Sequence, residues 1–240
     1  MKTCCVVSDL HLYFHQSSGF DYVEAIHSSA SNADALVMGG DIFDFRSTNG
    51  KTVHQRVESA ISWLKDFVSH HPHCHFYYLL GNHDHVPEYE RALSDLAEST
   101  PNLSWHPFYF RLGDTVFIHG DAAGRGMNQQ SLSRARAQWP IKKFMSRLLT
   151  LIYEIAWWLG IHRHINNICF PIEVVAERLV SYLEEIEHGP TAGVKEVYFG
   201  HTHIAISGYE HGGMKFHNCG SPVYDFEFNI LMTEIYESAH

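Results

Sequence analysis

Short strand-like runs that end at glycine, aspartate or histidine constrain the fold of this 240-residue chain more than any other feature. Three mainly apolar runs lie in the first third of the chain, at 3–8, 35–38 and 76–80. Runs of this length and composition predict strands that are buried on both faces. Helical patterns lie around and between them, at 22–31, 53–68 and 87–97. Strands alternating with helices predict a sheet covered by helices.

The rest of the chain is richer in strand patterns. Further strands are expected at 105–111, 115–119, 196–199, 204–209, 214–218 and 228–235. Alternation followed by a strand-rich half predicts an α/β sandwich of two mixed sheets. Between 126 and 187 the strand patterns give way to helical ones, which predicts a helical insertion with helix starts near Pro140 and Pro171.

The composition excludes several classes of protein. Apolar residues make up 45% and charged residues 18%, so the chain is expected to fold around a core. The net charge of -10 argues against nucleic acid as a partner. Histidine is in excess, with 20 against 17 Lys plus Arg, and this raises the expectation of a metal enzyme.

Cysteine usage and hydropathy bear on the compartment. The five cysteines form no CxxC pair, so we expect reduced thiols rather than disulfides or a zinc–thiolate site. A strand-like run begins at Cys4, close to Met1, so we expect no signal peptide. The most apolar stretch, 148–161, contains Glu154 and is shorter than the about 20 apolar residues that a membrane-spanning helix needs. A cytoplasmic location is therefore expected.

Residues that bind metals follow five of the predicted strands. The motifs are Asp9-Leu10-His11, Gly39-Gly40-Asp41, Gly81-Asn82-His83-Asp84, His119-Gly120-Asp121 and Gly200-His201-Thr202-His203. Loops at the carboxyl ends of strands converge on one crevice in α/β sheets, so these side chains should surround a common point. Carboxylate, amide and imidazole ligands without a thiolate suit Mn²⁺, Fe or Zn²⁺ better than Ca²⁺. Two such ions about 3.5–4 Å apart can clamp both oxygens of a phosphoryl displacement.

The five motifs, in this order, resemble those of the calcineurin-like metallophosphoesterase superfamily. The resemblance covers 1–124 and 191–240, which would form the catalytic core, and leaves 125–190 as a helical lid insertion. It implies a four-layer α/β/β/α sandwich of two mixed sheets.

The resemblance also implies roles for individual residues. One metal ion would be held by Asp9, His11, Asp41 and His203, and the other by Asp41, Asn82, His119 and His201. The cofactors would be two divalent ions, with manganese preferred over iron or zinc. A hydroxide bridging the metals would attack phosphorus. His83 would protonate the leaving group, and Asp84 would orient His83.

Some polar residues keep a purely structural alternative. Asp84 and Asp121 could form turns or hydrogen bonds, and Asp44 either supports the site or caps a helix. A loose cluster at a helix-to-strand turn is expected to be solvated rather than a metal site; it comprises His70, His71, His73 and His75.

The predicted insertion combines an apolar helix with basic residues. Apolar side chains cover most of the circumference of the helix expected at 144–159, which is typical of a buried helix or of one that touches lipid. Basic residues lie just upstream and are candidates for binding substrate phosphate or anionic headgroups. They are Arg134, Arg136, Lys142 and Lys143.

In length, lid position and lid composition the chain is similar to the UDP-2,3-diacylglucosamine hydrolases of lipid A synthesis. This similarity implies hydrolysis of the pyrophosphate of a UDP-acylated glucosamine, with the lid resting on the inner face of the cytoplasmic membrane and no obligate protein partner. The third motif departs from that group, which typically has arginine where this chain has His83. Two alternatives stay open: a soluble phosphoesterase of nucleotides, small diesters or phosphoproteins, and a non-catalytic scaffold, which the complete ligand set disfavours.

Overall fold

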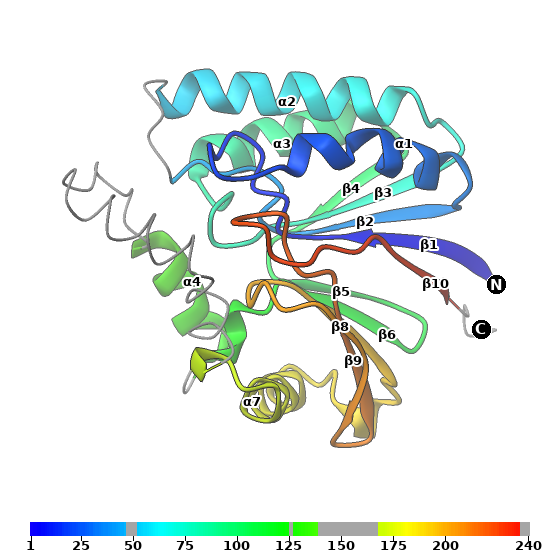
Figure 1. The fold of residues 1–240 in the computed structure, drawn as a ribbon, viewed down its shortest axis with the longest axis vertical. Helices are drawn as coiled ribbons and strands as arrows, with labels where there is room; N and C mark the ends of the chain where they lie inside the picture. The colour runs from blue at the N-terminus through cyan, green and yellow to red at the C-terminus, as the bar shows by residue number, and fades with distance from the viewer. Residues whose placement is uncertain (47–51, 125–126, 139–167, 236–240) are drawn as a thin grey trace.

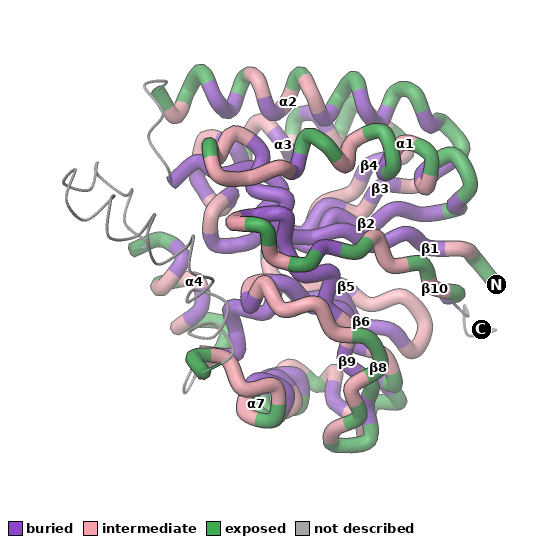
Figure 2. The backbone as a smooth tube through the Cα atoms, viewed as in Figure 1, coloured by how far each residue is buried: buried purple, intermediate pink, exposed green. Residues whose placement is uncertain are grey.

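Two sheets lie between two layers of helices (Figure 1). A computed structural model describes residues 1–46, 52–124, 127–138 and 168–235. The strands between the helical layers are largely buried, whereas the outward faces of the helices are exposed (Figure 2). The predicted α/β sandwich of two mixed sheets is therefore confirmed.

The first sheet contains the three apolar runs of the N-terminal third. Its strands are β1 (Lys2–Val7), β2 (Ala35–Gly39), β3 (His75–Leu79), β4 (Leu103–His106) and β10 (Leu231–Ile235). Their order is β10-β1-β2-β3-β4, and only β10 runs antiparallel to its neighbour. The parallel strands β1, β2 and β3 therefore all end at the same edge of the sheet.

Three helices connect these strands and cover the outer face of the sheet. They are α1 (Val23–Ser31), which follows the short helix η1 (Gly19–Tyr22), α2 (Val53–Ser69) and α3 (Pro87–Ser99). Local sequence signals set two of the starts. Thr52 and Gln55 form a capping box before α2, and Pro87 occupies the first turn of α3.

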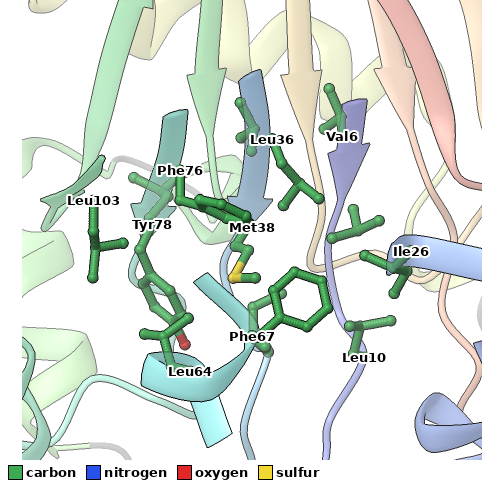
Figure 3. Close-up of a cluster of buried hydrophobic side chains, with 14 of the residues drawn as sticks. Val6, Leu10, Ile26, Leu36, Met38, Leu64, Phe67, Phe76, Tyr78 and Leu103 are labelled. Atoms are coloured by element: carbon green, nitrogen blue, oxygen red, sulfur yellow. The ribbon is translucent and has the colours of Figure 1, made fainter. Parts of the chain in front are cut away.

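Apolar side chains fill the space between this sheet and its helices. Leu64 and Phe67 of α2 belong to the same cluster of buried side chains as Met38 and Phe76 of the sheet (Figure 3). Each of these four side chains is almost completely buried, which contributes about 1.5–3 kcal/mol per residue to folding. This packing fixes the sheet on which the ends of β1, β2 and β3 are displayed.

The second sheet comes from the strand-rich part of the chain. It contains β5 (Tyr109–Leu112), β6 (Thr115–Ile118), β7 (Glu196–Phe199), β8 (Ile206–His211) and β9 (Met214–Asn218), in the order β5-β6-β7-β9-β8. β6 runs parallel to β7, and β7 to β9, while the two outer pairs are antiparallel. Short helices η2 (Asp121–Ala123) and η3 (Pro190–Ala192) follow β6 and precede β7.

The predicted strand 105–111 is wrong as a single element. The chain leaves the first sheet after His106 and enters the second at Tyr109, so Pro107 and Phe108 connect two different sheets. Proline lacks the N–H that a continuous strand would need, which explains the break.

The predicted insertion contains two described helices with different surroundings. α4 (Gln129–Gln138) lies beside the end of β6, whereas α7 (Ile172–Glu185) packs through Val175 and Leu179 on the second sheet and forms its outer layer. Pro171 caps α7, as predicted.

The predicted separation of a lid insertion at 125–190 from the catalytic core stays a prediction, but α7 shares a core with the second sheet. Pro140 and 144–159 lie outside the described residues.

Within the described ranges, no helix is long and apolar enough to cross a membrane.

Candidate metal centre

The carboxyl ends of β1, β2 and β3 meet those of β6 and β7 where the two sheets face each other. All five predicted motifs follow these strands directly, and backbone hydrogen bonds join their loops. The amide of Asp9 donates to the carbonyl of Gly40 (3.0 Å), and that of His11 donates to the carbonyl of Asp41 (2.9 Å). The structure therefore brings the predicted ligands together, as the strand-end argument expected.

The backbone at this centre is strained. Five predicted ligands have left-handed φ values between 45° and 68°, namely Asp9, His11, Asp41, His201 and His203. Such conformations cost non-glycine residues about 1–3 kcal/mol each and persist where the surrounding structure enforces them. Their concentration at one point is typical of a functional site.

One group of ligands lies around Asp9. The Nε2 atoms of His11 and His203 are 3.1 Å apart, and Nε2 of His203 is 3.4 Å from Oδ1 of Asp9. Oδ2 of Asp41 lies 3.8 Å from Nε2 of His11. These four residues are the set that the resemblance assigned to one metal ion.

A second group lies around Asn82. Its Oδ1 atom is 2.9 Å from Nδ1 of His201 and 3.2 Å from Nε2 of His119. The same Nε2 atom of His119 lies 3.2 Å from Oδ2 of Asp41. Asp41 thus contacts both groups, which is the position that a bridging carboxylate needs. The ligand assignments themselves stay predictions.

Two observations test whether these residues suit metal ions. Oδ2 of Asp9 is buried and has no hydrogen-bond partner among the described residues, which is costly for a carboxylate unless a cation neutralises it. Three triads also place a ligand atom of each member within 4.8 Å of the others: Asp9, His11 and His203; His11, Asp41 and His83; Asp9, Asp41 and His119. The donor set therefore fits divalent ions.

Glycines allow the loops to approach this closely. A Cβ atom on Gly81 would lie 2.2 Å from Oδ1 of Asp41, and one on Gly200 would lie 2.1 Å from Oδ2 of Asp9. No real side chain tolerates such distances, so both positions require glycine for the carboxylates to sit where they do.

The electrostatics of the centre favour cation binding. Burial lowers the pKa of His11 to about 3 and that of His201 to about 4, so both rings are neutral and able to coordinate. Burial would raise the pKa of Asp41, but the nearby histidines, His119 first, hold it well below its usual value. His119 differs: burial opposes its charge, yet Asp41 raises its pKa to about 10.

His83 lies at the accessible edge of the centre. Its side chain is 16% exposed, and its ring meets that of His11 edge-on, with centroids 4.7 Å apart. The carboxylate beside it is Asp44, whose Oδ2 lies 3.3 Å from Nδ1 of His83. The amide of His83 also donates to Oδ1 of Asp41 (2.7 Å), which couples this loop to the centre.

Asp84 does not take the role predicted for it. Its buried carboxylate accepts hydrogen bonds from the amide of Gly81 (2.6 Å), the amide of Ile42 (3.2 Å) and the hydroxyl of Tyr78 (2.8 Å). These bonds hold the carboxylate against the sheet, so Asp84 supports the loops, while the carboxylate beside the ring of His83 is that of Asp44. Asp44 lies three residues after Asp41 in the sequence, and this spacing was the available signal.

Arg136 was also predicted to bind substrate, but its side chain is occupied elsewhere. It is 1% exposed and forms a paired ion bridge with Asp121, through Nε (2.7 Å) and Nη2 (2.8 Å). Its carbonyl accepts a hydrogen bond from Arg46, whose guanidinium also bonds the carbonyl of Asn82. Arg136 therefore fastens α4 to the metal-site loops. Arg134 is exposed on α4, and Lys142 and Lys143 lie outside the described residues.

Comparison with known proteins identifies the family. A model of the calcineurin-like phosphoesterase family matches residues 3–205, which include all five motifs. The chain belongs to the calcineurin-like phosphoesterase family. The protein is therefore a metallophosphoesterase, which is a hydrolase. This assignment removes the alternative of a non-catalytic scaffold. Members of this family typically depend on two divalent metal ions, which agrees with the two ligand groups that share Asp41.

Other comparisons add little to the family assignment. A search of curated proteins finds no significant match. One solved crystal structure aligns at 11% sequence identity and a TM-score of 0.45, over 98% of this chain and 100% of the other. A likeness this distant carries no inference about this phosphoesterase.

Proposed function

We propose that this phosphoesterase hydrolyses a phosphodiester or phosphoanhydride bond at the centre shared by Asp9, Asp41 and Asn82, with His83 donating a proton to the leaving group. The observation that carries the proposal is the position of Asp41 between two ligand groups, with His83 tied to it at the accessible edge. When bound, two divalent ions supply positive charge to the phosphoryl oxygens and activate water.

The chain's own residues would divide the remaining work. Asp44 lies on the Nδ1 side of the His83 ring and would orient it, which would leave Nε2 as the atom that reaches a substrate oxygen. Proton transfer from a positioned histidine typically contributes about 10²–10⁴-fold to a rate. Manganese is the proposed metal, because the oxygen-and-imidazole donor set suits it.

A direct experiment uses bis(4-nitrophenyl) phosphate as a generic diester. Metal-free protein should be inactive and regain turnover on addition of Mn²⁺, and His83→Asn should lower kcat by about 10²–10⁴-fold without releasing metal. Full activity of His83→Asn, with the ions still bound, would disprove its role as proton donor.

For the substrate we propose a UDP-acylated glucosamine, cleaved at its pyrophosphate to UMP and an acylated glucosamine 1-phosphate. The support is the apolar segment 148–161 with basic residues before it. Apolar side chains also lie where the described chain resumes after that segment. Phe170 meets the ring of His201 at 6.0 Å between centroids, and Ile168 is 77% exposed. We further propose that this region contacts the membrane surface peripherally.

The substrate proposal is tested by incubating Mn²⁺-loaded protein with UDP-2,3-diacylglucosamine and measuring UMP. Turnover of the soluble diester without UMP release would exclude this substrate while leaving the phosphoesterase intact. Replacing Trp157 and Trp158 by serine should weaken turnover of the acylated substrate but not of the soluble one. A loss of stability with equal loss of both activities would favour a soluble natural substrate instead.

A further inference from the structure

A second group of histidines lies far from the active site, where α1 and α2 approach each other. His27 belongs to α1, while His70 and His71 follow directly on α2. The prediction that this turn is solvated is only partly correct. His70 and His73 are exposed, whereas His71 is buried, with 4% of its surface exposed. The turn leads into the first residues of β3, whereas the metal centre lies beyond the opposite ends of the parallel strands (Figure 1).

His27 and His71 face each other through their ring nitrogens. Nδ1 of His27 lies 2.8 Å from Nε2 of His71, and the two ring centroids are 5.0 Å apart. The other nitrogen of His71 lies 3.4 Å from the hydroxyl of Ser31. A hydrogen bond between two imidazoles requires that one facing nitrogen be unprotonated, so the pair already presents a lone pair at this point.

Charge and burial keep this pair in the form that binds metals. Burial lowers the pKa of His27, and the neighbouring His70 lowers it further. Burial also lowers the pKa of His71, with His27 as the next cause. Neutral imidazole is the state in which histidine coordinates a cation.

Further donors lie within reach of the pair. The ring of His70 is centred 6.0 Å from that of His27, and its Nδ1 atom lies 3.9 Å from Oδ2 of Asp66. The side chains of His70 and Asp66 are 60% and 78% exposed, so both can rotate without disturbing the core. Asp66 also acts electrostatically on His27, which places its charge close to the pair.

We propose that His27 and His71, completed by His70 and Asp66, bind one Zn²⁺ ion at a site separate from the active centre. Three imidazoles and one carboxylate are a normal tetrahedral zinc donor set. At Zn–N distances of about 2.0–2.1 Å, two tetrahedral ligands are about 3.3 Å apart, so the facing nitrogens need to separate only slightly. A bound ion would join α1 to the end of α2 and stabilise the fold by mass action.

Zinc content per chain tests the proposal. After equilibrium dialysis against Zn²⁺, wild type should hold one more zinc ion per chain than His27→Gln or His70→Gln. His54→Gln is the matched control, because His54 also lies on α2 beside a carboxylate four residues away and is 65% exposed. This control should retain the wild-type zinc content. Equal zinc content in wild type, His27→Gln and His70→Gln would overturn the proposal.

Two further readouts separate this site from the catalytic one. Adding Zn²⁺ to the Mn²⁺-loaded protein should raise the thermal midpoint of wild type and His54→Gln by more than that of His70→Gln, in which only exchange at the active centre is left. His70→Gln should keep wild-type turnover of the diester, because His70 lies outside the active centre. If His27→Gln fails to fold, His70→Gln decides the question, since its exposed side chain is dispensable for packing.

Discussion

The carboxylate beside the ring of His83 is that of Asp44 and not that of the aspartate that follows His83 in the sequence. Nδ1 of His83 lies 3.3 Å from Oδ2 of Asp44, whereas Asp84 is held by Gly81, Ile42 and Tyr78. Adjacent residues in this loop thus serve different purposes. His83 faces the centre, and Asp84 connects the loop to the sheet.

Replacing each aspartate by asparagine should separate these roles. Asp44→Asn should lower kcat by about 10–100-fold with little change in KM, because a misoriented His83 transfers its proton less well. Asp84→Asn should instead lower the free energy of unfolding by about 1–3 kcal/mol, because a buried hydrogen-bonded acceptor is lost. Steady-state kinetics and urea unfolding distinguish the two. The same kinetic loss in both variants, without destabilisation, would contradict this division.

Asp41→Ala should remove metal and activity together. Asp41 contacts both ligand groups, through His11 at 3.8 Å and His119 at 3.2 Å, so its loss should weaken both ions. The measurement is metal content after dialysis, alongside turnover of the diester. The control is Asp114→Ala, which removes a carboxylate paired with the exposed Lys195 and should retain both ions. Turnover by Asp41→Ala at wild-type rates would exclude a shared bridging ligand.

The sequence was most informative where short-range patterns decide the structure. Apolar runs such as 35–38 predicted the buried strands, and the polar residues directly after them predicted which side chains meet. The strand-end rule needs only the direction of parallel strands. The positions of Asp9, Asp41 and Asn82 follow from it without any knowledge of side-chain contacts.

Contacts between distant segments were not predictable in the same way. Arg136 looked like a solvent-exposed base in a basic segment, but its partner Asp121 lies fifteen residues earlier, beyond a separate turn. His71 looked solvated because its sequence neighbours are polar, yet α1 supplies His27 across the turn. In both cases burial depends on which helix packs against the residue, and local composition does not encode that choice.

Metal affinity should rise with pH because of His119. Burial would lower the pKa of His119, but the charge of Asp41 and the hydrogen bond to it raise that pKa to about 10. A coordinating imidazole nitrogen must be unprotonated, so below pH 10 binding releases a proton. One released proton corresponds to about a tenfold gain in Mn²⁺ affinity per pH unit. Calorimetric titrations between about pH 7 and 9, in buffers of different ionisation enthalpy, measure both quantities. Constant affinity with no proton release would refute the prediction.

The ion pair of Arg136 and Asp121 should stabilise α4 against the core. Arg136→Met leaves Asp121 buried without its partner and should cost about 3–5 kcal/mol of unfolding free energy. The double variant Asp121→Leu with Arg136→Met should recover most of that loss, because it removes both charges. Urea unfolding of the two single variants and the double variant measures the coupling. Additive losses would show that the two residues do not act as a pair.

Gly200→Ala should selectively disturb the metal ion at Asp9. The added Cβ would lie 2.1 Å from Oδ2 of Asp9, the carboxylate oxygen that has no hydrogen-bond partner within the described part of the chain. Asp9 must therefore move away from His203, so the variant should bind one Mn²⁺ ion tightly instead of two. The control is Gly208→Ala, because Gly208 has a φ of +71° with nothing within 4 Å of an added Cβ. Placing alanine at a positive φ costs about 1–2 kcal/mol in stability, so this variant should be less stable yet bind both ions normally. Metal stoichiometry measured by calorimetry compares the two, and two tightly bound ions in Gly200→Ala would show that Asp9 is not a ligand.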